Sequence, residues 1–346
     1  MSILTLKGIT PPKNWQNTND ETNHFHDGLN HPWYQLLFDL SSSIAFATYS
    51  FFKEKEYSVA LPPITCGSVT SPMGLGSDSL PVKINLFGEP TYLADSMQFH
   101  LEYLLRHQEK GVFYIMPSFR GEEPDYRHLN QFFHIEAEIR GDLSDVIQCV
   151  NAYLTYILES IYKKHYDDIL KFIGNTRHIE SFLNKKSPEI IYFKDAIKLL
   201  KNEAKFFNFH EHKIIGLNHL GEKTLMEQIG ESIWLSHLPR IGVPFYQAND
   251  SDDSQSALAA DFLAGIGEII GCGERHTNAT DLVAAIQERE VASTEYEWYI
   301  QLKQLYPLKT SGFGLGLERL LLWILKHDDI RDIPIIQRLK NKKSFP

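Results

Sequence analysis

Hydrophobic and polar residues alternate in clear patterns over about half of the chain. Apolar positions recur at helical spacing over residues 33–55 and again over 142–165, and both segments predict long amphipathic helices. The apolar run 112–116 and the returning segment 131–139 predict a β-hairpin whose two strands flank a charged loop. A glycine-rich strand over 311–319, followed by an unbroken apolar run, predicts a strand that leads directly into a buried helix.

The remaining segments complete the expected order of elements. We expect further helices at 96–107, 193–205, 224–238, 280–291 and 294–306, and strands at 56–61, 82–87, 90–93, 242–246 and 259–270. Hairpins joined by long connections that do not alternate with helices favour an α+β protein with a mainly antiparallel sheet, flanked by helices, over a doubly wound fold. Residues 1–32 are polar and predict an arm without a core of its own, and 33–346 form one domain. Within it, 166–222 is the least regular part, and we interpret it as a helical insertion.

Composition narrows the classes of protein that the chain can belong to. Hydrophobic residues make up 43% and charged residues 23% of its 346 residues, as expected for a globular protein in water. No run approaches the roughly 20 apolar residues of a membrane span, and the amino terminus lacks a signal-peptide pattern, so we expect a cytoplasmic protein. Three widely spaced cysteines fit a reducing compartment. The formal net charge of −10 argues against extensive contact with nucleic acid.

The glycine-rich stretch 311–319 is the first candidate for chemistry. Glycines at alternate positions let a ligand approach the backbone closely, and Arg319 offers a planar fork of donors to an anion. The stretch therefore fits a nucleotide platform. It fits equally well a glycine-containing strand beneath a core helix with a surface arginine, so this segment alone does not decide.

Two further segments make the pattern specific. Phe-Arg-Gly-Glu at 119–122, with Arg-His-Leu-Asn-Gln-Phe at 127–132, resembles motif 2 of the class II aminoacyl-tRNA synthetases, and 312–319 resembles their motif 3. The helix that ends before Pro62-Pro63 resembles motif 1. The segments 265–271 and 330–332 are most similar to the asparaginyl type, with the aspartyl type next. The resemblance covers about 33–338, and it implies a six- to seven-stranded antiparallel sheet, a homodimer through the motif 1 helix, and acyl-adenylate formation from ATP.

The resemblance also implies a role for each matching residue at the ATP site. Arg120 would hold the α-phosphate and the attacked carboxylate, and Glu122 would bind the adenine amino group. Phe132 and Arg319 would lie on the two faces of the adenine, with Arg319 also near the γ-phosphate. The other implied groups are His128 at the terminal phosphates, Gly316 at the nucleotide, and Asp261 and Glu268, on one strand and its exit, as ligands of Mg²⁺. Such a cationic clamp suits adenylation, which depends mostly on positioning and on neutralising charge.

On the amino-acid side, the resemblance assigns Gln98 to the substrate backbone and Arg275 to its side-chain carboxylate or amide. Glu231 matches an acidic position of the relatives, and Leu101 stands where aspartyl enzymes carry a lysine. Ser71-Pro72 replaces an expected Glu-Gly pair whose glutamate receives the substrate ammonium, which suggests a substrate held differently or another ammonium acceptor.

About 32 residues precede the motif 1 helix, too few for the anticodon-binding barrel of the tRNA ligases. The chain in this respect resembles the archaeal asparagine synthetase related to these enzymes. The sequence therefore favours adenylation of aspartate, or a close analogue, and transfer to ammonia, with weak tRNA binding at best. Three alternatives remain open: transfer from aspartate or asparagine to another small amine, asparaginyl-tRNA ligation, and a non-catalytic regulator.

Overall fold

The computed structural model describes residues 10–16, 21–71 and 79–341. Its centre is an eight-stranded sheet in the order β1-β5-β6-β13-β12-β11-β10-β7. These strands are β1 (Ser58–Val59), β5 (Gly111–Phe119), β6 (Gln131–Arg140), β7 (Glu189–Tyr192), β10 (Ser232–Ser236), β11 (Ala259–Ala264), β12 (Gly267–Glu274) and β13 (Thr310–Gly316). The six inner strands are antiparallel, whereas β1 and β7 pair in parallel with their neighbours at the two edges. The expected α+β class is confirmed, and the sheet is larger and more mixed than expected.

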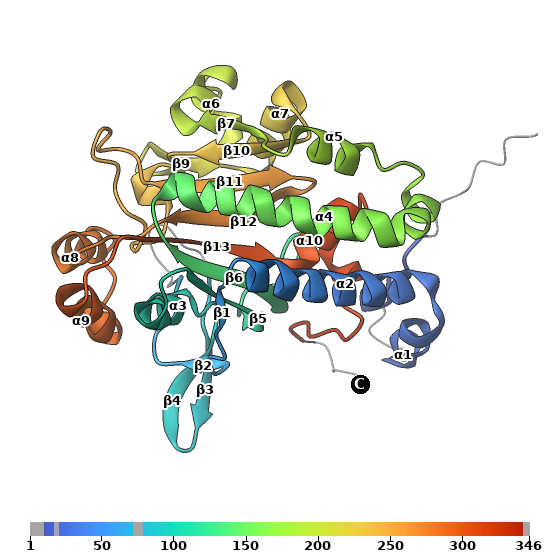
Figure 1. The fold of residues 1–346 in the computed structure, drawn as a ribbon, viewed down its shortest axis with the longest axis horizontal. Coiled ribbons are helices and arrows are strands. Elements are labelled where there is room, and N and C mark those ends of the chain that lie inside the picture. Colours follow the sequence, from blue (N-terminus) through green and yellow to red (C-terminus); the bar gives the residue numbers. More distant parts are fainter. Residues whose placement is uncertain (1–9, 17–20, 72–78, 342–346) are drawn as a thin grey trace, which may run out of the picture.

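Two long helices cover one face of this sheet, α2 (Pro32–Glu54) and α4 (Leu143–Ile173), which run side by side in Figure 1. His31 begins α2 by accepting a hydrogen bond from the Trp33 N–H at 3.2 Å, and Pro32 occupies the first turn. Asp142 and Asp145 form a capping box at the start of α4, and Gly174 ends the helix in a left-handed conformation. Both amphipathic patterns in the sequence therefore correspond to helices that bury their apolar faces on the main core.

The short helix α10 (Leu317–Ile324) follows β13 without a loop and lies on the same face, so the predicted strand-to-helix junction is confirmed. The other helices are α1 (Glu21–Asn30), α3 (Gln98–Leu104), α5 (Arg177–Lys185), α6 (Phe193–Leu199), α7 (His219–Ile229), α8 (Ala279–Glu288) and α9 (Glu297–Leu305). In the described parts of the chain, no helix is long and apolar enough to cross a membrane.

The segment 166–222 differs from the expected helical insertion. It contains α5 and α6, but also the edge strand β7 and the two-stranded hairpin β8 (Phe207–His210) and β9 (Lys213–Leu217). This hairpin and the helices α6 and α7 pack on β10 and β11 through a second apolar cluster. The hairpin, α6 and α7 therefore cover one half of the sheet on the face opposite α4, whereas α5 packs beside α4 on the main core.

Three of the elements expected between residues 224 and 270 were predicted wrongly. The expected helix 224–238 is the end of α7 followed by β10, because the chain leaves the helix at Gly230 and Ile233 to Leu235 are buried in the sheet. The expected strand 242–246 is a loop that follows a short 3-10 turn, Arg240–Gly242. The expected strand 259–270 is two strands, β11 and β12, separated by a turn in which Gly265 has φ +60°.

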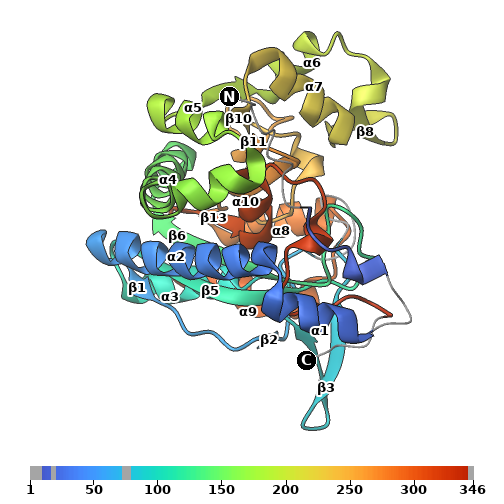
Figure 2. The ribbon, with the colours of Figure 1, turned by 90° about the vertical axis from the view of Figure 1, so that its right-hand side faces the viewer.

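The amino-terminal arm and a three-stranded sheet complete the described structure. The expected arm contains α1, and the indole of Trp15 donates to Asp332 at 2.6 Å and packs against the main core, so these contacts attach the arm to the domain. A small sheet of β2 (Thr65–Cys66), β3 (Val82–Leu86) and β4 (Glu89–Leu93) includes the β3–β4 hairpin, which projects from the body in both views (Figures 1 and 2).

Candidate active site

On β6 and β13, every second residue faces away from α2 and α4, on the other side of the sheet. Glu136 and Glu138 of β6 lie opposite Gly314 and Gly312 of β13. A Cβ on Gly312 would lie 1.8 Å from a carboxylate oxygen of Glu138, and one on Gly314 would lie 2.9 Å from Glu136. The glycines therefore leave room for two glutamates to lie flat across the strands, in addition to exposing backbone. This close packing explains why the motif needs glycine on this face.

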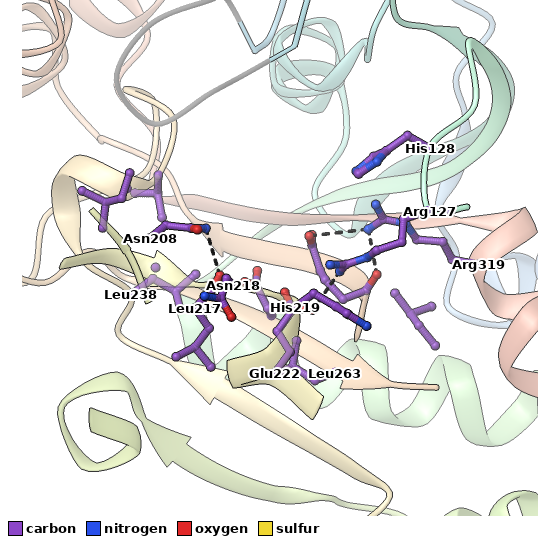
Figure 3. Close-up of a pocket in the computed structure, with 18 of the residues that line it drawn as sticks. Arg127, His128, Asn208, Leu217, Asn218, His219, Glu222, Leu238, Leu263 and Arg319 are labelled. Atoms are coloured by element: carbon purple, nitrogen blue, oxygen red, sulfur yellow. Dashed lines mark hydrogen bonds and ion pairs between the residues drawn. The ribbon is translucent and has the colours of Figure 1, made fainter. Parts of the chain in front are cut away.

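A cavity of about 990 Å³ opens on this face, between the sheet and the 166–222 insertion. Figure 3 shows part of its lining, with Arg127, His128 and Arg319 at one end and Asn208 and Leu238 at the other. The cavity brings together eight residues that the sequence assigned to ATP and metal binding, namely Arg120, Glu122, His128, Phe132, Asp261, Glu268, Gly316 and Arg319. Segments almost 200 residues apart in the sequence thus line one space.

Three guanidinium groups, among several carboxylates, line this cavity. Arg120 lies over the ring of Phe132 at 5.5 Å, and its Nε is buried without a hydrogen-bond partner. Arg319 donates to the backbone oxygen of Glu268 at 2.7 Å. Arg127, which the sequence analysis did not assign, donates to Glu222 at 2.7 Å. Burial lowers the pKa of Arg319 from its usual range near 12.5, but the group stays cationic at neutral pH.

Two other polar side chains of the cavity lining, Glu122 and His128, suit different parts of a nucleotide. Oε2 of Glu122 is buried without a hydrogen-bond partner, so this carboxylate is free to accept from an amino group. His128 is half exposed and contacts Asp125 at 2.9 Å, and burial together with Arg319 lowers the pKa of its imidazole. A neutral imidazole that can gain charge suits a position beside terminal phosphates.

The two expected metal ligands lie on adjacent strands, Asp261 on β11 and Glu268 on β12, and not on one strand. They still converge, because a Cβ on Gly271 would lie 2.9 Å from Oε1 of Glu268 and 3.7 Å from Oδ1 of Asp261. Burial, followed by the charges of Glu268 and Glu222, holds the pKa of Asp261 well above its usual range. Such crowding of negative charge is relieved when a cation binds.

In the described parts of the chain, no group of three or more His, Cys, Asp or Glu side chains is placed to hold a metal ion alone. Mg²⁺ commonly uses one or two carboxylates together with substrate phosphates and water. Asp261 and Glu268 therefore fit Mg²⁺ that arrives with a nucleotide, rather than a permanent metal centre.

Arg275 lies outside the cavity lining, in a buried cluster beside it. Its guanidinium donates to Glu138 at 3.1 and 3.2 Å and to Gln247 at 2.9 Å, over the ring of Tyr246 at 5.2 Å. Facing Glu138, the guanidinium has a raised pKa despite its burial. Three of its five N–H groups are thus used by the protein, which leaves two for a ligand.

Glu136 joins this cluster to the cavity and was missed by the sequence analysis. It accepts from Ser96 Oγ at 2.7 Å and from the hydroxyl of Tyr114, and its other oxygen lies 3.4 Å from His134, which lines the cavity. Burial raises the pKa of Glu136 to about 7. Its position in the motif 2 strand, two residues from His134 and on the same face, was the only signal in the sequence.

The other residues assigned to the amino-acid pocket have different outcomes. Gln98 is buried at the first position of α3, where its N–H donates to Ser96 Oγ at 3.2 Å, but it does not line the cavity. Glu231 is exposed in the bend before β10 and also lies outside the cavity lining. The helix α7 ends at Ile229, and Glu231 lies between its end and the first residue of β10.

The loop before the β3–β4 hairpin is held by a buried carboxylate. Asp95 accepts from the backbone N–H of Thr70 at 2.9 Å and of Ser71 at 2.7 Å. Burial raises its pKa, and Arg120 partly opposes this shift. Pro72, the other residue that replaces the expected Glu-Gly pair, lies outside the described residues. Asp95 is therefore a second acidic group, unassigned from the sequence, beside Ser96 and Glu136.

The fold, the cavity lined by arginines and the paired carboxylates define a class II aminoacyl-tRNA synthetase domain. The family model of class II tRNA synthetases (D, K and N) matches residues 20–338, and the chain belongs to this family. Asparagine–tRNA ligase of Thermoplasma acidophilum is 29% identical over 335 residues, which are 94% of this chain and 76% of the relative. The enzyme of the same name from Pyrococcus abyssi is 30% identical over 312 residues, 89% of this chain and 69% of the relative.

A solved structure supports the same assignment. The asparaginyl-tRNA synthetase of Pyrococcus horikoshii, complexed with asparaginyl-adenylate, superimposes with a TM-score of 0.84 at 26% identity. The match covers 97% of this chain and 76% of that protein. The recognition of an asparaginyl-type class II domain from the three motifs is therefore confirmed.

Proposed function

We propose that this protein activates asparagine with ATP and Mg²⁺, forming asparaginyl-adenylate and releasing pyrophosphate. The observation that carries the proposal is the convergence of Arg120, Arg127 and Arg319 beside the paired carboxylates of Asp261 and Glu268. Three cations can bind the phosphates, and the carboxylates can hold the metal that accompanies them. Asparagine–tRNA ligases among the relatives, and the solved complex with asparaginyl-adenylate, support this reading.

Asparagine replaces aspartate, which the sequence favoured, as the proposed substrate. The cluster beside the cavity holds three buried carboxyl groups, Asp95, Glu136 and Glu138, and Glu138 already pairs with Arg275. The side-chain carboxylate of aspartate would be a further negative charge in this space, whereas the amide of asparagine is neutral and can donate to Glu136. Asp95, the carboxyl group that remains, can accept the substrate ammonium in place of the missing loop glutamate.

The chain's own residues supply positioning and charge neutralisation. Arg120 would bridge the α-phosphate and the substrate carboxylate, which shortens the path of attack and reduces repulsion between two anions. Phe132 would stack on the adenine, and Glu122 would accept from its amino group. Arg319, Arg127 and His128 would neutralise the terminal phosphates as pyrophosphate leaves. Mg²⁺ held by Asp261 and Glu268 would supply further neutralisation of the phosphate oxygens.

For the acceptor, the names of the relatives support tRNA. Transfer to ammonia, expected from the sequence, has no such support, and tRNA remains the acceptor that the comparisons favour. We also propose a cytoplasmic location, in line with a relative from Encephalitozoon cuniculi named a probable cytoplasmic asparagine–tRNA ligase, 27% identical over 90% of this chain.

We propose further that the protein is a homodimer through α2. The outward side of this helix exposes Phe38 (62%), Phe46 (72%) and Tyr49 (42%), and Leu61 beyond β1 is 89% exposed. These positions form an apolar stripe on a helix whose opposite face is already buried in the core. A second copy of the chain would cover the stripe.

Pyrophosphate exchange tests the first half of the reaction. Purified protein with ATP, Mg²⁺ and labelled pyrophosphate should form labelled ATP when asparagine is added. Aspartate should support exchange at least about tenfold less well, since a site that pairs with an amide discriminates against a charged analogue. Equal exchange with the two amino acids would contradict the choice of asparagine, and exchange with neither would contradict the proposed adenylation.

A further inference from the structure

Two residues of the ATP site, Arg120 and Glu122, begin the loop between β5 and β6, which we call the motif 2 loop (120–130). Among the described residues, Nε of Arg120 and Oε2 of Glu122 are buried without a hydrogen-bond partner. The protein therefore does not hold either side chain through these atoms before a nucleotide binds. Their position then depends largely on how firmly the backbone of residues 120–122 is held, and small displacements of such groups are costly.

The side-chain amide of Asn130 holds this backbone from the other end of the motif 2 loop. Its Nδ2 donates to the backbone oxygen of Arg120 at 3.1 Å and to that of Glu122 at 2.6 Å. The backbone oxygen of Asn130 in turn accepts from the N–H of Arg120 at 2.9 Å, directly beyond the last pair of the β5–β6 ladder. One asparagine thus contacts the backbone of both ATP-site residues.

The remaining polar atom of this amide contacts a segment far away in the sequence. Oδ1 of Asn130 accepts from the backbone N–H of Lys340 at 2.7 Å, and Nζ of Lys340 lies 2.5 Å from Oε1 of Glu123. The backbone N–H of Ile330 donates to the backbone oxygen of Tyr126 at 2.9 Å. We call residues 330–341 the backing segment, because these three contacts join it to the motif 2 loop.

The backing segment is itself anchored to the body of the domain. The side chain of Asp332 is fully buried and accepts from Lys13 at 3.0 Å and from the indole of Trp15 at 2.6 Å. Its backbone oxygen accepts from the indole of Trp33, on α2, at 2.8 Å. Leu339, next to Lys340, packs in the main core. A segment fixed at several points is a firm support for a loop that must hold its shape.

We infer that Asn130 is a positioning residue that sets Arg120 and Glu122 for ATP, and that the backing segment keeps Asn130 in place. The inference rests on the proposed roles of Arg120 and Glu122 in ATP binding. An asparagine amide offers two N–H donors and an acceptor oxygen, and all three functions are used here. Since Glu122 would accept from the adenine amino group, loss of Asn130 should weaken the preference for adenine.

The experiment measures nucleotide preference, which does not depend on how much of a variant is folded. Calorimetry on the full chain with Mg²⁺ gives the Kd of ATP and of inosine triphosphate, whose base carries an oxygen in place of the amino group. The wild type should bind inosine triphosphate at least about tenfold more weakly than ATP. Asn130→Asp, which places a carboxylate against two backbone oxygens, and Asn130→Ala should each reduce this ratio to about twofold or less. Pyrophosphate exchange should show kcat/KM for ATP lowered about 10²-fold.

Asn85→Asp is the matched control for the change in charge. Asn85 is exposed in the β3–β4 hairpin, where its Oδ1 accepts from the N–H of Gly88 at 2.9 Å, and the substitution keeps this acceptor. A second pair of variants tests the backing segment. Lys340→Pro removes the N–H that reaches Asn130 and should reduce the ratio, whereas Lys340→Ala removes only the ion pair with Glu123 and should leave the ratio within twofold of the wild type.

A wild-type ratio in Asn130→Ala would overturn the inference while leaving adenylation intact, and this variant, which adds no charge, decides the case if Asn130→Asp does not fold. A wild-type ratio in Lys340→Pro would overturn the part given to the backing segment. Absence of pyrophosphate exchange with any amino acid would overturn the proposed function instead, and the calorimetric ratios would still decide on Asn130. Equal affinity of the wild type for the two nucleotides, or binding of neither, would overturn the role of Glu122 and the inference with it.

Discussion

The buried carboxyl of Glu136 gives a prediction whose magnitude follows from the structure. The side chain is 2% exposed, and burial raises its pKa from 4.5 to about 7. In the unfolded chain the group ionises near pH 4.5, whereas in the folded protein it stays protonated until about pH 7. The folded state is therefore favoured at low pH, and this advantage is lost as the pH rises through that window. The difference between these two pKa values corresponds to about 3 kcal/mol of unfolding free energy.

Glu136→Gln removes the titration but keeps an oxygen that can accept from Ser96 and Tyr114. We expect the variant to gain about 2 to 3 kcal/mol relative to the wild type when the pH changes from 5 to 8, since part of the loss has occurred by pH 5. Urea denaturation of both proteins at the two pH values measures this difference in unfolding free energy. Groups that titrate alike in both proteins do not contribute to the difference. Glu109→Gln, at an exposed glutamate, is the control and should show no such change.

The reasoning would be refuted if the difference in unfolding free energy between Glu136→Gln and the wild type were the same at pH 5 and pH 8. That result would mean that Glu136 ionises in the folded protein as it does in water. The carboxylate would then already be charged at neutral pH, and its hydrogen bond from Tyr114 would compensate fully for its burial.

Three other predictions concern the arginines and the surface of α2. Arg120→Ala should reduce pyrophosphate exchange about 10²- to 10³-fold through lost charge stabilisation, and exposed Arg140→Ala should not; near-normal exchange in Arg120→Ala would contradict the adenylation assignment. Arg275→Lys, which keeps a cation beside Glu138, should raise the KM for asparagine at least about tenfold. The ATP affinity measured by calorimetry should stay within twofold, because Arg275 lies outside the cavity lining. An equal loss of both affinities would show that the role of Arg275 is structural. Phe46→Lys should shift the protein to monomer at micromolar concentration in light scattering, and Leu305→Lys, on exposed α9, should not; a wild-type monomer would contradict the dimer.

Local patterns in the sequence were sufficient for the elements that carry the motifs. The helices α2 and α4 and the junction of β13 with α10 follow from apolar spacing, since each buries one continuous face. Arg120, Glu122, His128, Phe132 and Arg319 lie within contiguous motifs, and the structure brings all five to one cavity. Their short spacing fixes their relative positions as soon as the strand or turn that carries them forms.

Tertiary structure determined the positions of residues whose partners lie far away in the sequence. Arg127 and Glu222 are 95 residues apart, and only the packing of α7 against the sheet brings them together. The end of the expected helix 224–238 was predicted wrongly because the run 232–236 is as compatible with a buried helix as with a strand. Only its pairing with β11 selects the strand. The register of β6 against β13 then sets which glutamates face Gly312 and Gly314, because a slip of one residue would turn every side chain to the opposite face.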